Sequence, residues 1–217
     1  MDWRPLALSF EFSAIAAVFA GVLGIGLAAL LANKRFIGRD LLDVLVTAPM
    51  VLPPTVLGYY VLVALGRRSV IGHLYEELTG APIVFTRAGA VLAATLVALP
   101  LVVKSARAAL EGVDGTLIRA ARTLGASALR AFLTVQLPLA ARGITAGLVL
   151  GFARSLGDFG VTLMIAGNLP GETQTASLAI YDAIQANRDD DALGMVVVMS
   201  ALAIGALYGV SKLAAPR

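Results

Sequence analysis

Long uncharged runs alternate with short charged connections along the 217 residues of this chain. About 20 apolar residues, each rising 1.5 Å in a helix, cross the hydrocarbon core of a bilayer. Five runs meet or approach this length, although the third has only sixteen residues and the fourth contains Arg154 and Asp158. The pattern predicts five transmembrane helices, over residues 12–32, 44–66, 88–103, 143–166 and 192–211.

The composition is that of a membrane protein rather than a soluble domain, because 59% of the residues are hydrophobic and only 14% are charged. We therefore expect an all-α, polytopic membrane protein. No internal repeat or low-complexity linker divides the chain, so residues 1–217 are expected to form a single domain. The chain has no cysteine, which excludes disulfides, thiolate metal sites and cysteine nucleophiles.

The distribution of basic residues predicts the orientation in the membrane. With the N-terminus outside and the C-terminus inside, the inside connections hold eleven basic residues and the outside connections hold five. This asymmetry follows the positive-inside rule, although the adjacent pair Arg67 and Arg68 on the outside opposes it. Two short helices are expected in the outside connections, around residues 73–78 and 178–184.

The inside connection from 114 to 136 has the pattern of an amphipathic helix that does not span the membrane. Asp114 is the expected N-cap, with Gly115 and Thr116 as alternatives, Gly125 is expected to bend the helix, and Pro138 suits the first turn of the next span. The apolar stripe consists of Leu117, Ala121, Leu124, Ala128 and Phe132, and the basic side of Arg119, Arg122 and Arg130. Periodicity alone fits either a helix on the membrane surface or a docking helix for a cytoplasmic partner.

The same connection resembles the EAA loop of permease subunits of binding-protein-dependent ABC importers. The positions that match in spacing are Arg119, Ala120, Ala121, Gly125, Val135, Leu137 and Pro138. Two of them depart in residue type, because Arg119 stands where the family usually has Glu and Val135 where it often has Ile. The resemblance implies a coupling loop over residues 109–138 that docks through apolar side chains. The implied coupling residues are Leu117, Ala120, Ala121, Leu124, Gly125, Phe132, Leu137 and Pro138.

The resemblance also implies an ABC importer permease fold, a location and partners. We expect a homodimer in the cytoplasmic (inner) membrane of a prokaryote, with two cytoplasmic ATPase subunits that bind ATP and Mg²⁺. A periplasmic or extracellular oxyanion-binding protein is the expected outer partner. No Gly-x-x-x-x-Gly-Lys-Ser/Thr loop occurs in the chain, so we expect a transport subunit without a cofactor of its own, not an enzyme.

Further segments are similar to the molybdate branch of these permeases: residues 49–60, 65–72, 87–94, 109–114, 153–160 and 168–173. Tungstate or sulfate stays open as the cargo, because tetrahedral oxyanions of similar size demand few sequence differences. A membrane-bound signalling or assembly protein, whose basic helix binds lipid or a receptor domain, is the alternative outside transport.

Two groups of residues are candidates for a pathway or gate. One is Arg154, Ser155 and Asp158 in the fourth run, since ionisable groups inside a membrane are usually functional; the alternative is that the two charges only neutralise each other. The other is Pro53, Pro54, Thr55 and Tyr59 in the second run, where proline removes amide donors, and a kink used only for packing is the alternative.

No catalytic or metal-binding constellation is expected, because the chain has a single histidine, His73, and no paired carboxylates inside the spans. Nucleic-acid binding is not expected either, since the basic residues are scattered around the hydrophobic runs. Gly21, Gly24 and Gly26 in the first run are expected to form close helix contacts.

Overall fold

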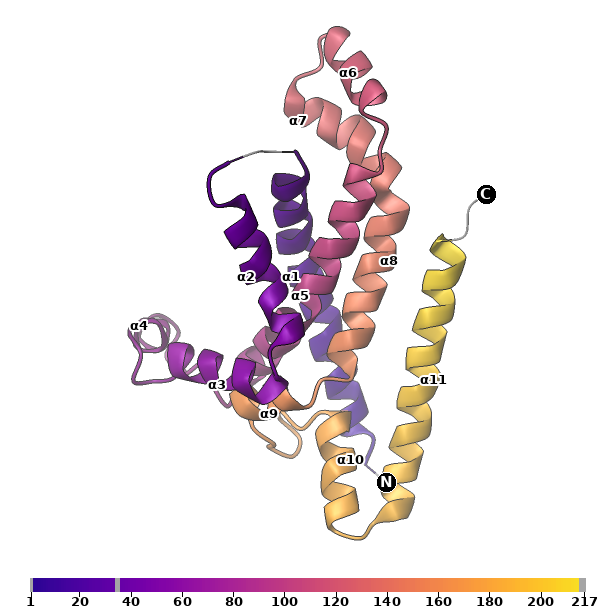
Figure 1. Ribbon diagram of the computed structural model, residues 1–217. Coiled ribbons are helices and arrows are strands. Elements are labelled where there is room, and N and C mark those ends of the chain that lie inside the picture. Colours follow the sequence, from indigo (N-terminus) through magenta and orange to yellow (C-terminus); the bar gives the residue numbers. More distant parts are fainter. Residues whose placement is uncertain (1, 34–35, 215–217) are drawn as a thin grey trace.

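The computed structural model describes residues 2–33 and 36–214, and every regular element in them is a helix (Figure 1). The all-α prediction is therefore confirmed. In chain order the elements are α1 (Arg4–Asn33), α2 (Arg39–Val51), α3 (Pro54–Leu65), α4 (Val70–Thr79), α5 (Arg87–Glu111), α6 (Gly115–Thr123), α7 (Ala128–Ala131), the π-helix η1 (Phe132–Gln136), α8 (Leu137–Leu156), α9 (Gly160–Ala166), α10 (Ala176–Gln185) and α11 (Asp189–Ala214).

Four helical segments of the described chain are long and apolar enough to cross a membrane, and the pair α2–α3 makes a fifth when it is counted as one span. The third predicted span gains length from its flanks, as expected, because α5 has 25 residues. The short helices predicted around 73–78 and 178–184 are also present, as α4 and α10.

The second predicted span is wrong as a continuous helix. The helices α2 and α3 are bent by 118° at their junction. Leu52 is extended, with φ −65° and ψ 138°, because the ring of Pro53 disfavours helical geometry in the residue before it. Pro54 then begins α3, where its missing N–H is not needed.

The fourth predicted span has the wrong boundaries at both ends. Its helical segment runs from Ala128 to Leu156 instead of over residues 143–166. Gly157, Asp158 and Phe159 separate it from the short helix α9. Hydropathy alone did not reveal this break, because residues 160–166 of α9 contain no charged residue and continue the apolar run.

The core lies where α1, α5 and α8 pack against one another. Three glycines of α8 spaced four residues apart, Gly143, Gly147 and Gly151, face α5. A Cβ added at Gly147 would lie 2.5 Å from the Cβ of Ser105. The helices can approach this closely only because these positions lack side chains.

The first helix joins this core through two of its three predicted contact glycines. A Cβ at Gly21 or Gly24 would lie 2.9 Å from Leu148 or Val102, so these two predictions are confirmed. The prediction for Gly26 is wrong, because no atom lies within 4 Å of a Cβ added there. Gly26 instead lines a groove.

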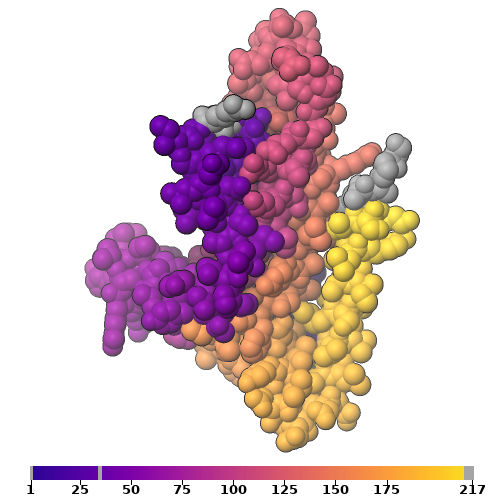
Figure 2. Space-filling view, viewed as in Figure 1, coloured from indigo at the N-terminus to yellow at the C-terminus, as the bar shows by residue number. Residues whose placement is uncertain are grey.

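The molecule has two projections from the bundle. At one end, α6 and α7 extend beyond the other helices, and on one side α3 and α4 form an arm (Figures 1 and 2). The end of α1, the start of α2 and the last turn of α11 also point toward the end with α6. The connections predicted to lie inside the cell therefore share one end of the molecule.

Candidate coupling loop and membrane pathway

The helix α6 begins at the predicted cap. The Oδ1 atom of Asp114 accepts a hydrogen bond of 2.8 Å from the backbone N–H of Thr116. This bond to the ionised carboxylate holds the pKa of Asp114 below its ordinary value, and the nearby Arg119 adds to the shift. The N-cap prediction for Asp114 is confirmed.

The helix α6 ends at Thr123, and Gly125 two residues later has a left-handed backbone with φ +89°. The N–H of Gly125 donates to the carbonyl of Arg122 at 3.1 Å, and the N–H of Ala126 donates to that of Ala121 at 3.1 Å. These two bonds form a Schellman motif, in which glycine is favoured because it has no Cβ. Ser127 then caps α7 by accepting a bond from the N–H of Arg130.

The single amphipathic helix predicted over residues 114–136 is therefore wrong. Gly125 does not bend a continuous helix but ends one helix, and the chain turns before α7 begins. A helical period that is continued across such a turn assigns residues to a common face that they do not share. The predicted stripe separates into a part on α6 and a part on α7 and η1.

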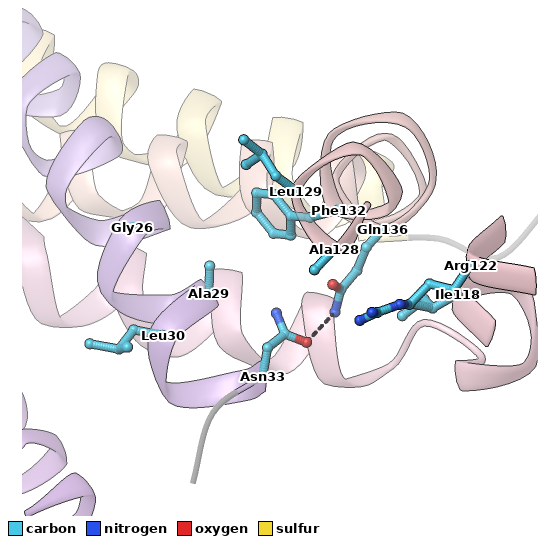
Figure 3. Close-up of a pocket in the computed structure, with 10 residues that line it drawn as sticks. All are labelled: Gly26, Ala29, Leu30, Asn33, Ile118, Arg122, Ala128, Leu129, Phe132 and Gln136. Atoms are coloured by element: carbon cyan, nitrogen blue, oxygen red, sulfur yellow. Dashed lines mark hydrogen bonds between the residues drawn. The ribbon is translucent and has the colours of Figure 1, made fainter. Parts of the chain in front are cut away.

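The π-helix η1 carries α7 directly into α8, and Pro138 lies in the first turn of α8 as predicted. Gln136 at the end of η1 is buried. Its Nε2 atom donates to Oδ1 of Asn33 at 3.1 Å and to the carbonyl of Leu110 at 3.2 Å (Figure 3). One side chain thus links the loop to the ends of both α1 and α5. Such π segments are frequent at functional sites.

The eight predicted coupling residues fall into two groups. On α6 and its C-terminal turn, Leu117 is 48% exposed and Leu124 is 88% exposed. Phe132 and Leu137 instead pack against the core between α1, α5 and α8. The outward group comprises Leu117, Ala120, Leu124, Gly125 and Pro138, with Ala121 half-buried.

The predicted pathway residues on α3 follow the bend after α2. Pro53, Pro54, Thr55 and Tyr59 are all exposed in this chain, and Tyr59 is exposed by 56%. The face of α3 that carries Pro54 and Gly58 packs on α9. Two close approaches fix this contact: a Cβ at Gly58 would lie 2.6 Å from Met164, and one at Gly160 would lie 2.7 Å from Pro54.

The other predicted pathway residues lie at the break between α8 and α9. Asp158 is buried, and its Oδ2 atom accepts bonds of 2.9 Å from both the N–H and the hydroxyl of Thr162. Its Oδ1 atom lies 3.8 Å from Nη1 of Arg154, which is 44% exposed. The hydroxyl of Ser155 donates to the carbonyl of Phe152. Asp158 therefore orders the start of α9, whereas Arg154 keeps most of its donors available.

The fold places these two groups of predicted residues at the same level of the helix bundle, which we call the layer of interrupted helices. Pro54 of the first group touches Gly160, two residues after Asp158 of the second. The helical path is interrupted after α2 and after α8, so non-helical backbone from two breaks meets in one region (Figure 1). Interrupted helices within a membrane are tolerated where they are buried in protein or line a water-filled cavity.

Comparison with known proteins decides which family has this architecture. Residues 20–214 match the model of the family described as binding-protein-dependent transport system inner membrane component. The chain belongs to this permease family. The permease is 44% identical over 199 residues, 92% of its length and 87% of the relative's, to the molybdenum transport system permease protein ModB of Escherichia coli (strain K12). It is 46% identical over 185 residues, 85% of its length and 81% of the relative's, to ModB of Haemophilus influenzae.

A solved structure has the same fold as the permease. It is a bacterial alginate ABC transporter in complex with an alginate pentasaccharide-bound periplasmic protein, matched with a TM-score of 0.73 over 97% of this chain and 76% of that chain. At 18% sequence identity this match concerns the fold alone. The predicted fold class and the assignment as a membrane transport subunit, not an enzyme, are thereby confirmed.

Sequence reasoning missed an ion network between α2 and α5 of the permease. Asp43 accepts bonds from Lys104 at 2.8 Å and from Arg107 at 3.0 Å. Arg107 also donates to Glu111 at 2.8 Å, and Arg39 lies 3.8 Å from the same carboxylate. A groove of about 470 Å³ runs along α2 beside this network, with Asp43 and Lys104 in its lining. The network fixes the shorter helix α2 against the core.

Within residues 2–33 and 36–214, no group of three or more His, Cys, Asp or Glu side chains is arranged to hold a metal ion. His73 lies on α4 beside Glu77, at 3.3 Å. The most distinctive features of the permease are thus the projecting loop and the layer of interrupted helices.

Proposed function

We propose that this permease is the membrane subunit of an ATP-driven molybdate importer. It acts as a homodimer, binds two ATPase subunits at the end that carries α6, and receives cargo from an oxyanion-binding protein at the other end. ATP and Mg²⁺ are held by the ATPase subunits. The cargo assignment is supported by the names of the relatives, which are molybdenum transport permeases at 44% and 46% identity.

The single observation that carries the coupling role is the exposed apolar face of α6. Leu117 and Leu124 lie seven residues apart, two helical turns, so they share one face, and Ala120 and Ala121 lie between them. The turn at Gly125 and the caps at Asp114 and Ser127 hold this face in place before any partner binds. A short helix with preformed ends and an apolar face suits binding in a groove of a partner protein.

The orientation of the permease follows from the same end of the molecule. The connections that share the end with α6 carry most of the basic residues of the chain. Because basic connections remain in the cytoplasm, we assign α6 to the inside, the N-terminus to the outside and the C-terminus to the inside.

The layer of interrupted helices is our candidate for the pathway. An oxyanion that enters a low-dielectric region needs replacement donors for its lost hydration. Arg154 supplies a cation that is 44% exposed, and Thr55 and Tyr59 supply exposed hydroxyls on α3. In this arrangement Asp158 and Ser155 order the helix ends, and Pro53 and Pro54 set the bend.

Reconstitution tests this function. Proteoliposomes with the permease, its ATPase subunits and its binding protein should accumulate molybdate only when ATP and all three components are present. Tungstate and sulfate are added as competitors, since they are the alternative cargoes. If unlabelled sulfate suppresses the uptake at a lower concentration than unlabelled molybdate does, sulfate is the cargo. Absence of any ATP-dependent oxyanion uptake, with all components assembled, would refute the proposal.

A further inference from the structure

A groove of about 660 Å³ separates the end of α1 from α6 and α7 (Figure 3). This size lies within the range of pockets that hold small ligands, about 300–1,000 Å³. Most of its lining is apolar, and three polar side chains lie toward one side of it. The lining residues are Gly26, Ala29, Leu30, Asn33, Ile118, Arg122, Ala128, Leu129, Phe132 and Gln136.

The floor of the groove is open at Gly26. A Cβ added there would meet no atom within 4 Å. Across the groove, Leu129 is 68% exposed, although large apolar side chains at such a position are usually covered. The groove can therefore accept an apolar chain without any rearrangement of the protein.

The groove lies at the depth of a membrane interface. The uncharged run of α1 ends at Ala32, and Asn33 is the last residue of the helix. Gly26 and Leu30 therefore lie in the hydrocarbon region, whereas Asn33 at the end of the helix lies at the level of the headgroups. This assignment of depth rests on the proposed function only for which side is inside.

The polar side of the groove is positively charged. Arg122 points toward Asn33 and Gln136 (Figure 3). No acidic side chain lines the groove, and Arg122 forms no ion pair with any residue of the described chain. An anionic group is the complement of this side.

The groove is separate from the proposed docking face. Residues of a helix are about 100° apart around its axis. Ile118 and Arg122, four residues apart, lie on one side of α6, and Leu117 and Leu124 lie on another, roughly 120° away. A ligand of the groove and a partner on the docking face can therefore be bound together.

We propose that this groove binds an anionic phospholipid of the inner leaflet, with an acyl chain along Gly26 and Leu129 and the phosphate at Arg122. Only an amphipathic anion satisfies both sides of the groove. Basic pockets between helices on the cytoplasmic side of membrane proteins bind such headgroups. A lipid bound there fills the space between α1 and the coupling loop.

Native mass spectrometry of the purified full-length permease tests the proposal, with phosphatidylglycerol and phosphatidylcholine of identical chains added in turn. We expect retention of phosphatidylglycerol over phosphatidylcholine. Arg122→Gln should weaken phosphatidylglycerol retention about fivefold, the value of one basic residue at an anionic surface. Arg119→Gln removes the same charge from α6 outside the groove and should leave retention unchanged.

A second variant tests the apolar part. Gly26→Leu places a side chain on the open floor, where an added Cβ meets no atom within 4 Å, and should abolish retention while preserving the melting temperature in detergent. Equal loss in the Arg122 and Arg119 variants would indicate a diffuse surface charge and overturn the proposal. Full competition by inorganic phosphate would show that only an anion is bound, and unchanged retention in Gly26→Leu would show that no chain lies in the groove. The measurement needs no ATPase, so its failure is distinguishable from failure of the proposed function.

Discussion

Gly125 provides a test of the coupling loop in which backbone strain and side-chain bulk have opposite consequences. Its φ of +89° is strained for a residue with a Cβ, while the space around a Cβ at this position is empty within 4 Å. Gly125→Ala therefore creates no clash, and its cost is the left-handed backbone alone, about 1–2 kcal/mol.

No buried side chain of α6 anchors this turn, so it depends on its local backbone and capping bonds. The strain should therefore appear as a loss of the loop conformation that docks. A cost of 1–2 kcal/mol corresponds to a factor of about 5–30 in that equilibrium. We expect Gly125→Ala to weaken binding of the ATPase subunits to the permease in nanodiscs by this factor, with an unchanged melting temperature of the bundle.

Gly125→Asn is the matched control. Asparagine is larger than alanine but adopts the left-handed conformation more readily than other residues with a side chain. If backbone geometry governs docking, the asparagine variant should recover most of the affinity that the alanine variant loses. Weaker binding by asparagine than by alanine would refute the reasoning and indicate that bulk at the contact is what matters.

Three further predictions concern the core, the pathway and the cap of α6. Gly147→Ala places a methyl group 2.5 Å from a side chain of α5 and should lower the free energy of unfolding by about 1–3 kcal/mol, whereas Gly205→Ala, with no atom within 4 Å, should not lower the melting temperature in detergent, because alanine is the better helix former. Arg154→Met should reduce ATP-driven oxyanion uptake but leave ATPase binding intact. Normal uptake by this variant would show that Arg154 only pairs with Asp158 and does not contact the cargo. The pKa of Asp114 lies below its ordinary value of 3.8, so the cap is present above that pH and is lost as the pH falls through the lower value; the amide NMR shift of Thr116 should titrate with a midpoint below 3.8, and a midpoint above 3.8 would contradict the bond.

The number of spans in this permease was predictable because lipid requires long apolar runs, which are visible in the sequence, although the fourth run did not give the bounds of its span. The bends and breaks of the helices within an apolar run were not predictable. The bend of 118° after Leu52 and the break after Leu156 lie within uninterrupted or nearly uninterrupted apolar sequence. Proline marked the first of these positions without revealing the angle, and Gly157 marked the second only weakly.

The ends of α6 were predictable from local chemistry, since Asp114 and Gly125 are typical residues for a cap and a turn. How the apolar residues after Gly125 are oriented relative to those of α6 was not predictable, because a helical period does not continue through a left-handed residue. Contacts between distant residues left no signal at all. Gln136 meets Asn33 across 103 positions, and Lys104 meets Asp43 across 61. Gly143, Gly147 and Gly151 in the fourth run, spaced by four residues, did carry a readable packing pattern.

Coupling across the membrane is the central claim, and the rate of ATP hydrolysis measures it most directly. The permease and its ATPase subunits are placed in proteoliposomes, and molybdate-loaded binding protein is added on the side opposite the ATPase. Hydrolysis should accelerate with the wild-type permease and fall to the unstimulated rate with Leu124→Asp, which places a charge on the docking face. Stimulation that is equal in the two proteins, or absent from the wild type with all components bound, would contradict the claim.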